Sequence, residues 1–554
     1  MRISRVAVLL LVTVLTSTRG SADAATTVSV RDFGAAGDGT IDDTPAIQRA
    51  IDAVGDAGVI FFPPGTYRVT QLRVGSRIAL VGAAPGAVTL RNTAPAGRNF
   101  SGIVTSAAAA GGVTDVEIRN LTFERTIETD AFDEHVYLEN CRRVVIENSR
   151  FVGRISRPQH AQKGVHLRGC RDARILNNVF EDIPDNALAL NWLDAATVAG
   201  HHVVSGNVFS RTSADPASQL IVTQSDVTIV ANVFRGQAPG GLAGNWIETG
   251  TANGSAIAGL SVTANSVRGF RSLIHDVNGL VAVGNVLHNA LLNVDAVEGR
   301  SRDVAFVGNV AIGGGFLRAK RADHVLVEGN VVTDSTGDGI MVQEASHVSI
   351  LGNRVRRAQR SGVFVDATTG AVVVADNACY DNGQGGVADA GFGVLVQNVA
   401  DATLAGNVCH DTQGGGRATQ RYGLVVNATR TVTLRGNHAA GNRQGAYHEM
   451  SVPAEVRRSG NSFDGTRDES TAARRLVAAW SPPRLAPGAQ TMAILALPGA
   501  ELGDPVIAGF SHDLRGLQLT AYVSAKNSVT VVLRNGTEDT ATLPPGRMKI
   551  HLLK

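Results

Sequence analysis

An asparagine recurs at nearly even steps through the middle of the chain, and no other feature limits the fold so strongly. The steps run from 20 to 33 residues. Most of these asparagines follow apolar residues five and three positions earlier, as in Val348, Ile350 and Asn353. This two-residue period is typical of a strand with one buried face. The recurring residues are Asn120, Asn148, Asn178, Asn207, Asn232, Asn265, Asn285, Asn309, Asn330, Asn353, Asn377, Asn407, Asn437 and Asn461.

Repeats of this length predict a solenoid, because one unit cannot bury its apolar face and gains a core only by stacking on its neighbours. Each unit is too short for a long helix and is rich in Val, Ile, Gly and Asn. We therefore expect a parallel β-helix of about 13 coils. The asparagines should stack at one turn, where their amides bond the coils above and below.

The first 24 residues are typical of a secretory signal peptide. Arg2 and Arg5 precede an apolar run over residues 6–15, and Ala22-Asp23-Ala24 fits a cleavage site. No later segment is apolar enough to span a bilayer. The formal net charge of +2 includes the leader arginines, so the mature chain is close to neutral. We expect a secreted protein that binds neither nucleic acid nor membrane.

The segment at residues 32–48, D-F-G-A-A-G-D-G-T-I-D-D-T-P-A-I-Q, leads into an expected helix over 44–54. Thr44 is its predicted N-cap, and Pro45 its first helical residue. Such a helix can cover the open end of a solenoid. The segment at residues 58–67, G-V-I-F-F-P-P-G-T-Y, then enters the first coil.

These two segments resemble the opening of the pectate-lyase-like superfamily of right-handed parallel β-helix proteins, which includes lyases, polygalacturonases and phage tailspikes. The resemblance implies an all-β, right-handed parallel β-helix. It also implies a structural role for Asp38, Asp42 and Asp43, and a polysaccharide that lies along one parallel sheet.

A composition break after Asn461 divides the chain. We expect the β-helix over residues 25–463, a linker over 464–482, and a small β-sandwich domain over 483–554 with a hairpin at Asn535-Gly536. Similar C-terminal domains in tailspikes and secreted relatives cap, bind or trimerise, so the resemblance allows a homotrimer.

The four cysteines form two pairs at equivalent positions of neighbouring coils, Cys141 with Cys170 and Cys379 with Cys409. Neighbouring coils lie about 4.8 Å apart, within reach of a disulfide. Reduced, buried thiols are an equally open alternative. A metal role is not indicated, because no second ligand stands at a suitable spacing.

Alternation along the strands before each asparagine predicts which side chains face outward on one sheet. Ile340 and Val342 should point in, and Met341 and Gln343 out. In the same register, the outward residues include His166, Arg168, Asn191, Glu248, His275, Asp295, Arg318 and Lys320. Further along the sheet Leu395 and Val425 predict a covered or idle surface.

We take Glu248, Asp295, Lys320 and His166 as candidate catalytic residues. Two carboxylates on one face suit glycoside hydrolysis, and a histidine or lysine can serve as a base. Arg168, His275, Arg318 and Asn191 are candidate substrate-binding residues. Each of these side chains has a plainer interpretation as a solvated surface group.

The densest acidic cluster is Asp130, Asp133, Glu134 and His135. It fits either a Ca²⁺ site or a solvated loop. No other residues suggest a metal, so the cofactor requirement stays open.

These patterns favour a secreted enzyme that cleaves a polysaccharide, with β-elimination of a uronic-acid polymer preferred. A cationic face could neutralise the uronate while a base removes the α-proton. A glycoside hydrolase is the first alternative, and a non-catalytic adhesin or tailspike-like glycan binder is the second. The Asn-Thr-Asp, Gly-His-Gly and Arg-Ile-Lys motifs of polygalacturonases and the Asp-Pro-His motif of alginate epimerases are absent.

Overall fold

The computed structural model describes most of the 554 residues. The described ranges are 26–92, 101–106, 112–126, 133–153, 162–212, 217–237, 241–252, 254–297, 299–387, 390–414, 416–451, 453–464, 466–467, 474–497 and 500–552. The predicted signal peptide lies outside them. Within these ranges, no helix has the length and apolarity needed to cross a bilayer.

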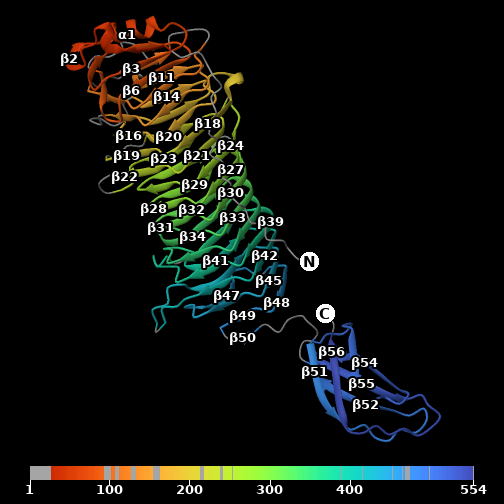
Figure 1. The fold of residues 1–554 in the computed structure, drawn as a ribbon. Coiled ribbons are helices and arrows are strands. Elements are labelled where there is room, and N and C mark those ends of the chain that lie inside the picture. Colours follow the sequence, from red (N-terminus) through yellow and green to blue (C-terminus); the bar gives the residue numbers. More distant parts are fainter. Residues whose placement is uncertain are drawn as a thin grey trace.

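Three long sheets wind around one core, parallel throughout except for the final β49–β50 pair, and each inner coil contributes one strand to each sheet (Figure 1). Sheet 1 contains β1 (Thr26–Ser29), β3 (Gly58–Phe62), β6 (Ile78–Gly82), β9 (Glu117–Arg119), β12 (Val145–Glu147), β15 (Arg174–Leu176), β18 (Ala199–Ser205), β21 (Ser225–Val230), β24 (Ile257–Thr263), β27 (Val277–Val283), β30 (Ser301–Val307), β33 (Ala322–Glu328), β36 (Ser346–Leu351), β39 (Thr369–Ala375), β42 (Asp401–Ala405), β45 (Thr431–Arg435) and β48 (Glu455–Ser459).

Sheet 2 follows sheet 1 in every coil after a short turn. It contains β2 (Asp38–Asp42), β4 (Gly65–Val69), β7 (Val88–Asn92), β10 (Thr122–Arg125), β13 (Arg150–Val152), β16 (Val179–Glu181), β19 (Val208–Arg211), β22 (Val233–Gly236), β25 (Ser266–Arg268), β28 (Val286–His288), β31 (Val310–Gly314), β34 (Val331–Ser335), β37 (Arg354–Arg356), β40 (Ala378–Tyr380), β43 (Val408–His410), β46 (His438–Ala440), β49 (Ser462–Phe463) and β50 (Thr466–Arg467).

Sheet 3 completes each coil and carries the candidate site. It contains β5 (Leu72–Val74), β8 (Ser101–Ser106), β11 (Asp133–Glu139), β14 (Val165–Arg168), β17 (Leu188–Asn191), β20 (Ser218–Val222), β23 (Asn245–Thr249), β26 (Arg271–His275), β29 (Leu291–Asp295), β32 (Phe316–Lys320), β35 (Ile340–Gln343), β38 (Val363–Asp366), β41 (Phe392–Gln397), β44 (Tyr422–Asn427) and β47 (Gly445–Glu449). The 15 strands exceed the predicted coil number, because the coils before Asn120 lack the marker asparagine.

The predicted asparagine ladder is present at the turn between sheets 1 and 2. Asn309 donates its backbone N–H and its Nδ2 to Oδ1 of Asn330, at 2.8 and 2.9 Å, and Asn330 donates in the same way to Asn353. The same pattern runs from Asn178 to Asn461. Each Nδ2 also bonds a carbonyl of the preceding coil, which satisfies buried backbone groups.

The predicted ladder position is wrong by one residue in two coils. Asn120 and Asn148 have φ of 59° and 52°, the left-handed conformation that a glycine adopts before most ladder residues. The ladder positions beside them are Leu121 and Ser149, and the Leu121 N–H bonds Ser149 Oγ. Asparagine tolerates left-handed backbone well, so the same residue type serves two adjacent positions.

One α-helix, α1 (Thr44–Ala53), lies at the N-terminal end of the described solenoid (Figure 1). Its Ala46, Ile47, Ala50 and Ile51 belong to the same apolar core as the coils. Asp43, rather than the predicted Thr44, is the N-cap residue. Its carboxylate bonds the N–H groups of Ala36 and Gly37, which confirms a structural role. Two short 3-10 helices, η1 (Val30–Phe33) and η2 (Ala195–Thr197), complete the helical elements of the described ranges.

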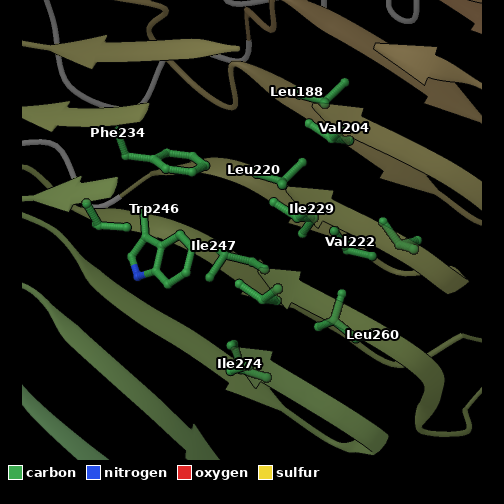
Figure 2. Close-up of a cluster of buried hydrophobic side chains, with 14 of the residues drawn as sticks. Leu188, Val204, Leu220, Val222, Ile229, Phe234, Trp246, Ile247, Leu260 and Ile274 are labelled. Carbon is green, nitrogen blue, oxygen red and sulfur yellow. The ribbon is translucent and has the colours of Figure 1, made fainter. Parts of the chain in front are cut away.

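The core is filled by stacked equivalents from successive coils (Figure 2). Phe123, Phe151, Phe180, Phe209 and Phe234 stack in sequence with ring centroids 4.7 to 5.0 Å apart. Trp246 meets the last ring edge-on at 5.3 Å. Such contacts add to the free energy gained by burying these large side chains.

Both cysteine pairs are spatial neighbours, as predicted. Cys141 and Cys170 form a disulfide with their Cα atoms 4.3 Å apart. Cys379 and Cys409 face each other in the register of β40 and β43 but remain free thiols. Burial raises the pKa of Cys409 well above its usual value, so this thiol stays protonated and packs as a small hydrophobe.

The C-terminal residues form two antiparallel sheets of three strands. One contains β51 (Arg474–Trp480), β56 (Gly546–Leu552) and β53 (Val506–Phe510), and the other β52 (Gln490–Ala496), β55 (Ser528–Asn535) and β54 (Leu517–Ala525). Apolar residues of both, including Val531 and Ile550, share one core.

Two predictions for this region need correction. β51 falls within the predicted linker 464–482, because its residues pair with β56 and do not remain extended. The hairpin lies at residues 526–527 between β54 and β55, where Asn527 has a φ of 64°. Asn535 instead ends β55, and its buried amide bonds Leu485 O and Asp539 O.

The buried His202 predicts acid sensitivity. Its Nδ1 accepts the Ala173 N–H at 3.1 Å, and its Nε2 lies 3.0 Å from Gln224 Oε1, which fits a neutral ring. Burial lowers the pKa of His202 to about 4, whereas the unfolded value is near 6.5. The unfolded state therefore takes up the proton first, and stability is lost as pH falls from about 6.5 to about 4.

At pH 5 this difference amounts to about 2 kcal/mol. In urea titrations, the free energy of unfolding of the parent chain should fall by about 2 kcal/mol more between pH 7 and pH 5 than that of His202→Gln. The exposed neighbour His201 provides the control, because His201→Asn should keep the full dependence. An unchanged pH dependence in His202→Gln would contradict the assignment.

Candidate functional site

The outward face of sheet 3 carries every side chain that the sequence named as a catalytic or substrate-binding candidate. The predicted alternation is present, since Ile340 and Val342 are fully buried while Met341 and Gln343 are partly exposed. The candidates lie on β14 (His166, Arg168), β17 (Asn191), β23 (Glu248), β26 (His275), β29 (Asp295) and β32 (Arg318, Lys320). Strand register places Arg168 beside Asn191, and His275 beside Asp295.

The tightest cluster surrounds His166. Its Nδ1 lies 3.0 Å from Oε1 of Glu134, a carboxylate with no exposed surface. A carboxylate on Nδ1 fixes the tautomer in which Nε2 is the basic nitrogen. The Tyr137 ring meets the imidazole edge-on, with centroids 5.2 Å apart, and Tyr137 is the direct strand neighbour of His166. A base, its orienting carboxylate and a phenol are therefore held together by β11 and β14.

Tyr137 is linked to the cationic Arg168 through Glu139. Its hydroxyl donates to Glu139 Oε2, which also pairs with Arg168 Nη1 at 3.2 Å. Burial, with the bond to Glu139 next, raises the pKa of Tyr137 far above its usual value. The phenol therefore keeps its proton at neutral pH and is suited to donate it. Asn191, beside Arg168, has a buried Oδ1 that bonds no described residue.

Lys163, three residues before His166 in the sequence, forms an ion pair with Asp185, and the Lys163 side chain is 9% exposed. We call Glu134, Tyr137, Glu139, His166 and Arg168 the His166 cluster. The sequence singled out His166, Arg168 and Asn191 but missed the roles of Tyr137, Glu139 and Lys163. Tyr137 and Glu139 occupy the same outward register one coil earlier, so alternation could have found them.

Glu248 and Asp295 are not brought together. Glu248 accepts a hydrogen bond from Ser218 Oγ, whereas Asp295 pairs with Arg321 at 2.8 Å. β26 lies between their strands, so two strand spacings, about 10 Å, separate the two backbones. Glycosidases hold their carboxyl groups about 5–5.5 or 6.5–9.5 Å apart. Each carboxylate is bonded to a different partner, so the two do not form a preassembled pair.

Two of the other candidates have a charged partner. Lys320 Nζ lies 3.3 Å from Glu344, and His275 Nδ1 lies 3.1 Å from the buried Asp276. His275 and Lys320 thus stand on the outward face of sheet 3 with an acidic group beside each. Such a surface can bind a chain that carries both hydroxyl and carboxylate groups.

A cavity of about 190 Å³ lies on the same face beside β32 and β35. Arg318, Phe316, Gln343, Asp338 and Arg360 are among its lining residues. The Asp338 carboxylate is almost fully buried, 3.4 Å from Arg360 Nε, and burial raises its pKa. Sequence reasoning missed Asp338 and Arg360, because both lie in turns outside the strand register.

The polar face ends beyond this cavity. Phe364, Leu395 and Val425 occupy outward positions of sheet 3, yet they are 8%, 5% and 0% exposed and pack with Phe392. The Arg421 guanidinium lies 5.6 Å from the Phe392 ring centre. This confirms the predicted covered surface on the part of sheet 3 that begins at β38.

In the acidic cluster considered for Ca²⁺, Glu134 and His135 make other contacts. Asp130 lies outside the described residues, and Glu134 bonds His166. The His135 ring nitrogens lie 3.3 and 3.0 Å from the carbonyl oxygens of Lys163 and Val152, and the ring packs against Phe151. Within the described ranges, no three His, Cys, Asp or Glu side chains are placed to hold a metal ion.

Comparison with known families agrees with this architecture. Residues 27–209 match a family model described as rhamnogalacturonase A/epimerase, pectate lyase-like. Residues 251–392 and 297–463 match a model of the right handed beta helix region. The chain belongs to the pectate-lyase-like superfamily of right-handed parallel β-helix proteins.

Within this superfamily, curated relatives match only a short segment. Mannuronan C5-epimerase AlgE3 of Azotobacter vinelandii is 40% identical over 89 residues, which cover 14% of this chain and 5% of the epimerase. Alginate lyase 7 of the same organism is 35% identical over 118 residues, which cover 19% of this chain and 14% of the lyase. The match thus spans a small part of either relative.

Among solved structures, the A-module of mannuronan C-5 epimerase AlgE6 of Azotobacter vinelandii is similar, with 19% identity and a TM-score of 0.32. The match covers 78% of this chain and 98% of that module.

Proposed function

We propose that the protein is a secreted lyase that cleaves a uronic-acid polysaccharide by β-elimination on the outward face of sheet 3. The His166 cluster carries this proposal, because it places a base, a proton donor and a cation side by side. Relatives named as an alginate lyase and mannuronan epimerases add support, since both names refer to uronic-acid polymers.

In the proposed reaction, His166 Nε2 accepts the proton from the sugar carbon next to the carboxylate. The electrons of that C–H bond form a carbon–carbon double bond, and the bond to the linking oxygen breaks. The Tyr137 hydroxyl gives its proton to that oxygen, and Arg168 binds the uronate and neutralises its charge. His166 is 3% exposed, so a sugar reaches it only after covering side chains such as Tyr137 shift.

The remaining candidates are proposed to bind the polymer. Six strand spacings separate β14 from β32, which corresponds to about 29 Å. Asn191, His275, Arg318 and Lys320 lie along this length, together with Glu248 and Asp295. A surface this long holds several sugar residues, so long chains should be better substrates than short ones.

A panel of acidic and neutral polysaccharides tests the proposal. We expect ultraviolet absorbance from unsaturated products and new reducing ends to rise together on a uronic-acid polymer. New reducing ends without absorbance would instead indicate hydrolysis. Binding without either signal would favour a non-catalytic glycan binder.

Substitutions of the separated carboxylates distinguish the two enzymatic mechanisms. If elimination occurs at the His166 cluster, Glu248→Gln and Asp295→Asn should raise KM on the polymer and leave kcat within a few-fold of the parent. A hydrolase that uses this pair would lose about 10²- to 10⁴-fold in kcat. Lys320→Gln is expected to behave as the two carboxylate variants do.

A further inference from the structure

A second cavity, of about 540 Å³, lies on the outward face of sheet 2. Its floor is formed by β34, β37 and β40, and its lining includes Val331, Arg354, Arg356, Arg357 and Tyr380. The volume falls within the roughly 300–1,000 Å³ of small-molecule sites. It belongs to a different sheet from the His166 cluster, so the proposed lyase reaction does not use it.

Two of its arginines are held in place by carboxylates. Arg357 forms a bidentate pair with Asp334, with both N···O distances 2.6 Å. Arg356 Nε lies 3.0 Å from Asp381, whose other oxygen accepts the Thr412 N–H at 2.6 Å. These bonds fix the guanidinium groups before any ligand arrives, which reduces the entropy lost on binding.

Arg354 differs from both. It is exposed, and its strand neighbours are Val331 on one side and Ala378 on the other. No carboxylate among the described residues forms an ion pair with it. Its planar fork of donors therefore remains open to an anion with two oxygens, such as a carboxylate.

Apolar side chains stand next to Arg354 on the neighbouring strands. Val331 and Ala378 flank it on the strand face, and the Tyr380 ring lies one strand from Arg356. A pyranose ring has an apolar face that packs on such a surface, while its carboxylate meets the guanidinium. We infer that this cavity is a second, non-catalytic binding site for an acidic saccharide.

Calorimetric titration of the full chain with a uronic-acid oligosaccharide tests this site. His166→Gln serves as the parent, so that the ligand is not cleaved. Adding Arg354→Gln should remove one binding event or weaken it at least tenfold. Arg268→Gln is the matched control, because Arg268 is an exposed strand arginine on the same sheet outside the cavity, and it should leave both events unchanged.

The outcome is independent of the lyase proposal. If sheet 3 also binds the ligand, the stoichiometry falls from two to one in Arg354→Gln, and otherwise from one to zero. Arg354→Lys should show an intermediate loss, since it keeps the charge but not the fork. Unchanged binding in a folded Arg354→Gln variant would overturn the inference. Equal binding of the neutral oligosaccharide, or of inorganic phosphate at the same site, would overturn it as well.

Discussion

Replacing His166 by glutamine is expected to lower β-elimination on a uronic-acid polymer by about 10²- to 10⁴-fold, the usual effect of losing a general base. Glutamine can still bond Glu134 but cannot accept the substrate proton at neutral pH. The loss should appear in kcat, measured by ultraviolet absorbance of the unsaturated product. The melting temperature should change little, because glutamine retains the bond to Glu134.

Two variants accompany this measurement. His288→Gln alters a partly exposed histidine on sheet 2 and should keep the parent rate. Glu134→Gln keeps the shape of the orienting group but removes its charge, so it should lower kcat, because the positive charge that forms on His166 during proton transfer loses its carboxylate partner. Full activity of His166→Gln on a polymer that the parent cleaves would place the chemistry elsewhere on the molecule.

Removing the disulfide should lower the free energy of unfolding by more than the protonation of His202 does. The bridge between Cys141 and Cys170 closes a loop of 29 residues. The chain-entropy relation for a loop of this length gives about 3.5 kcal/mol at 25 °C. We expect Cys141→Ser with Cys170→Ser to lower the free energy of unfolding by about this amount in urea titrations.

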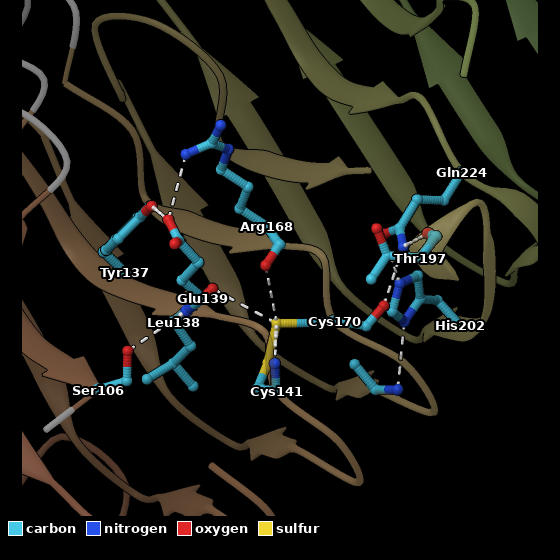
Figure 3. The surroundings of a disulfide bond; sticks show 11 residues. Ser106, Tyr137, Leu138, Glu139, Cys141, Arg168, Cys170, Thr197, His202 and Gln224 are labelled. Carbon is cyan, nitrogen blue, oxygen red and sulfur yellow. Dashed lines mark hydrogen bonds and ion pairs between the residues drawn. A yellow bond between two sulfur atoms is a disulfide. The ribbon is translucent and has the colours of Figure 1, made fainter. Parts of the chain in front are cut away.

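The disulfide also lies close to the proposed chemistry. Cys141 and Cys170 follow directly after the strands that carry Glu139 and Arg168 (Figure 3). The double variant should therefore lose activity at temperatures where it remains folded. A reductant should lower the melting temperature of the parent but leave that of the double variant unchanged. Denatured, unreduced protein should titrate two thiols, and four after reduction; four without reduction would show that the bridge does not form.

The strand register could be predicted because the side-chain period is 2 and one face must be buried. Ile340 and Val342 are therefore inside, and the outward candidates share one sheet. The asparagine ladder could be predicted for the same reason, since each rung has the same phrase before it. The error at Asn120 and Asn148 arose because asparagine suits both the rung and the left-handed residue before it.

The details of the site could not be predicted in this way. The contact of Glu134 with His166 joins two coils 32 residues apart, and alternation says nothing about which rotamers meet. Asp338 and Arg360 lie in turns, where no period applies. The phenylalanine stack, in contrast, follows a sequence regularity that could predict it, since each of these rings stands two or three residues after a ladder-region asparagine.

Because of the asparagine ladder, the number of coils can change without disturbing the bonds between the coils that remain. Each inner asparagine donates in one direction to an identical acceptor on the next coil. Deleting one whole repeat, such as residues 310–330, would leave every remaining asparagine with the same kind of partner. Sheet 3 would shorten by one strand, about 4.8 Å, with the His166 cluster untouched. Adding or removing repeats would therefore change the length of the surface proposed to bind the polymer, while the residues proposed for the chemistry stay in place.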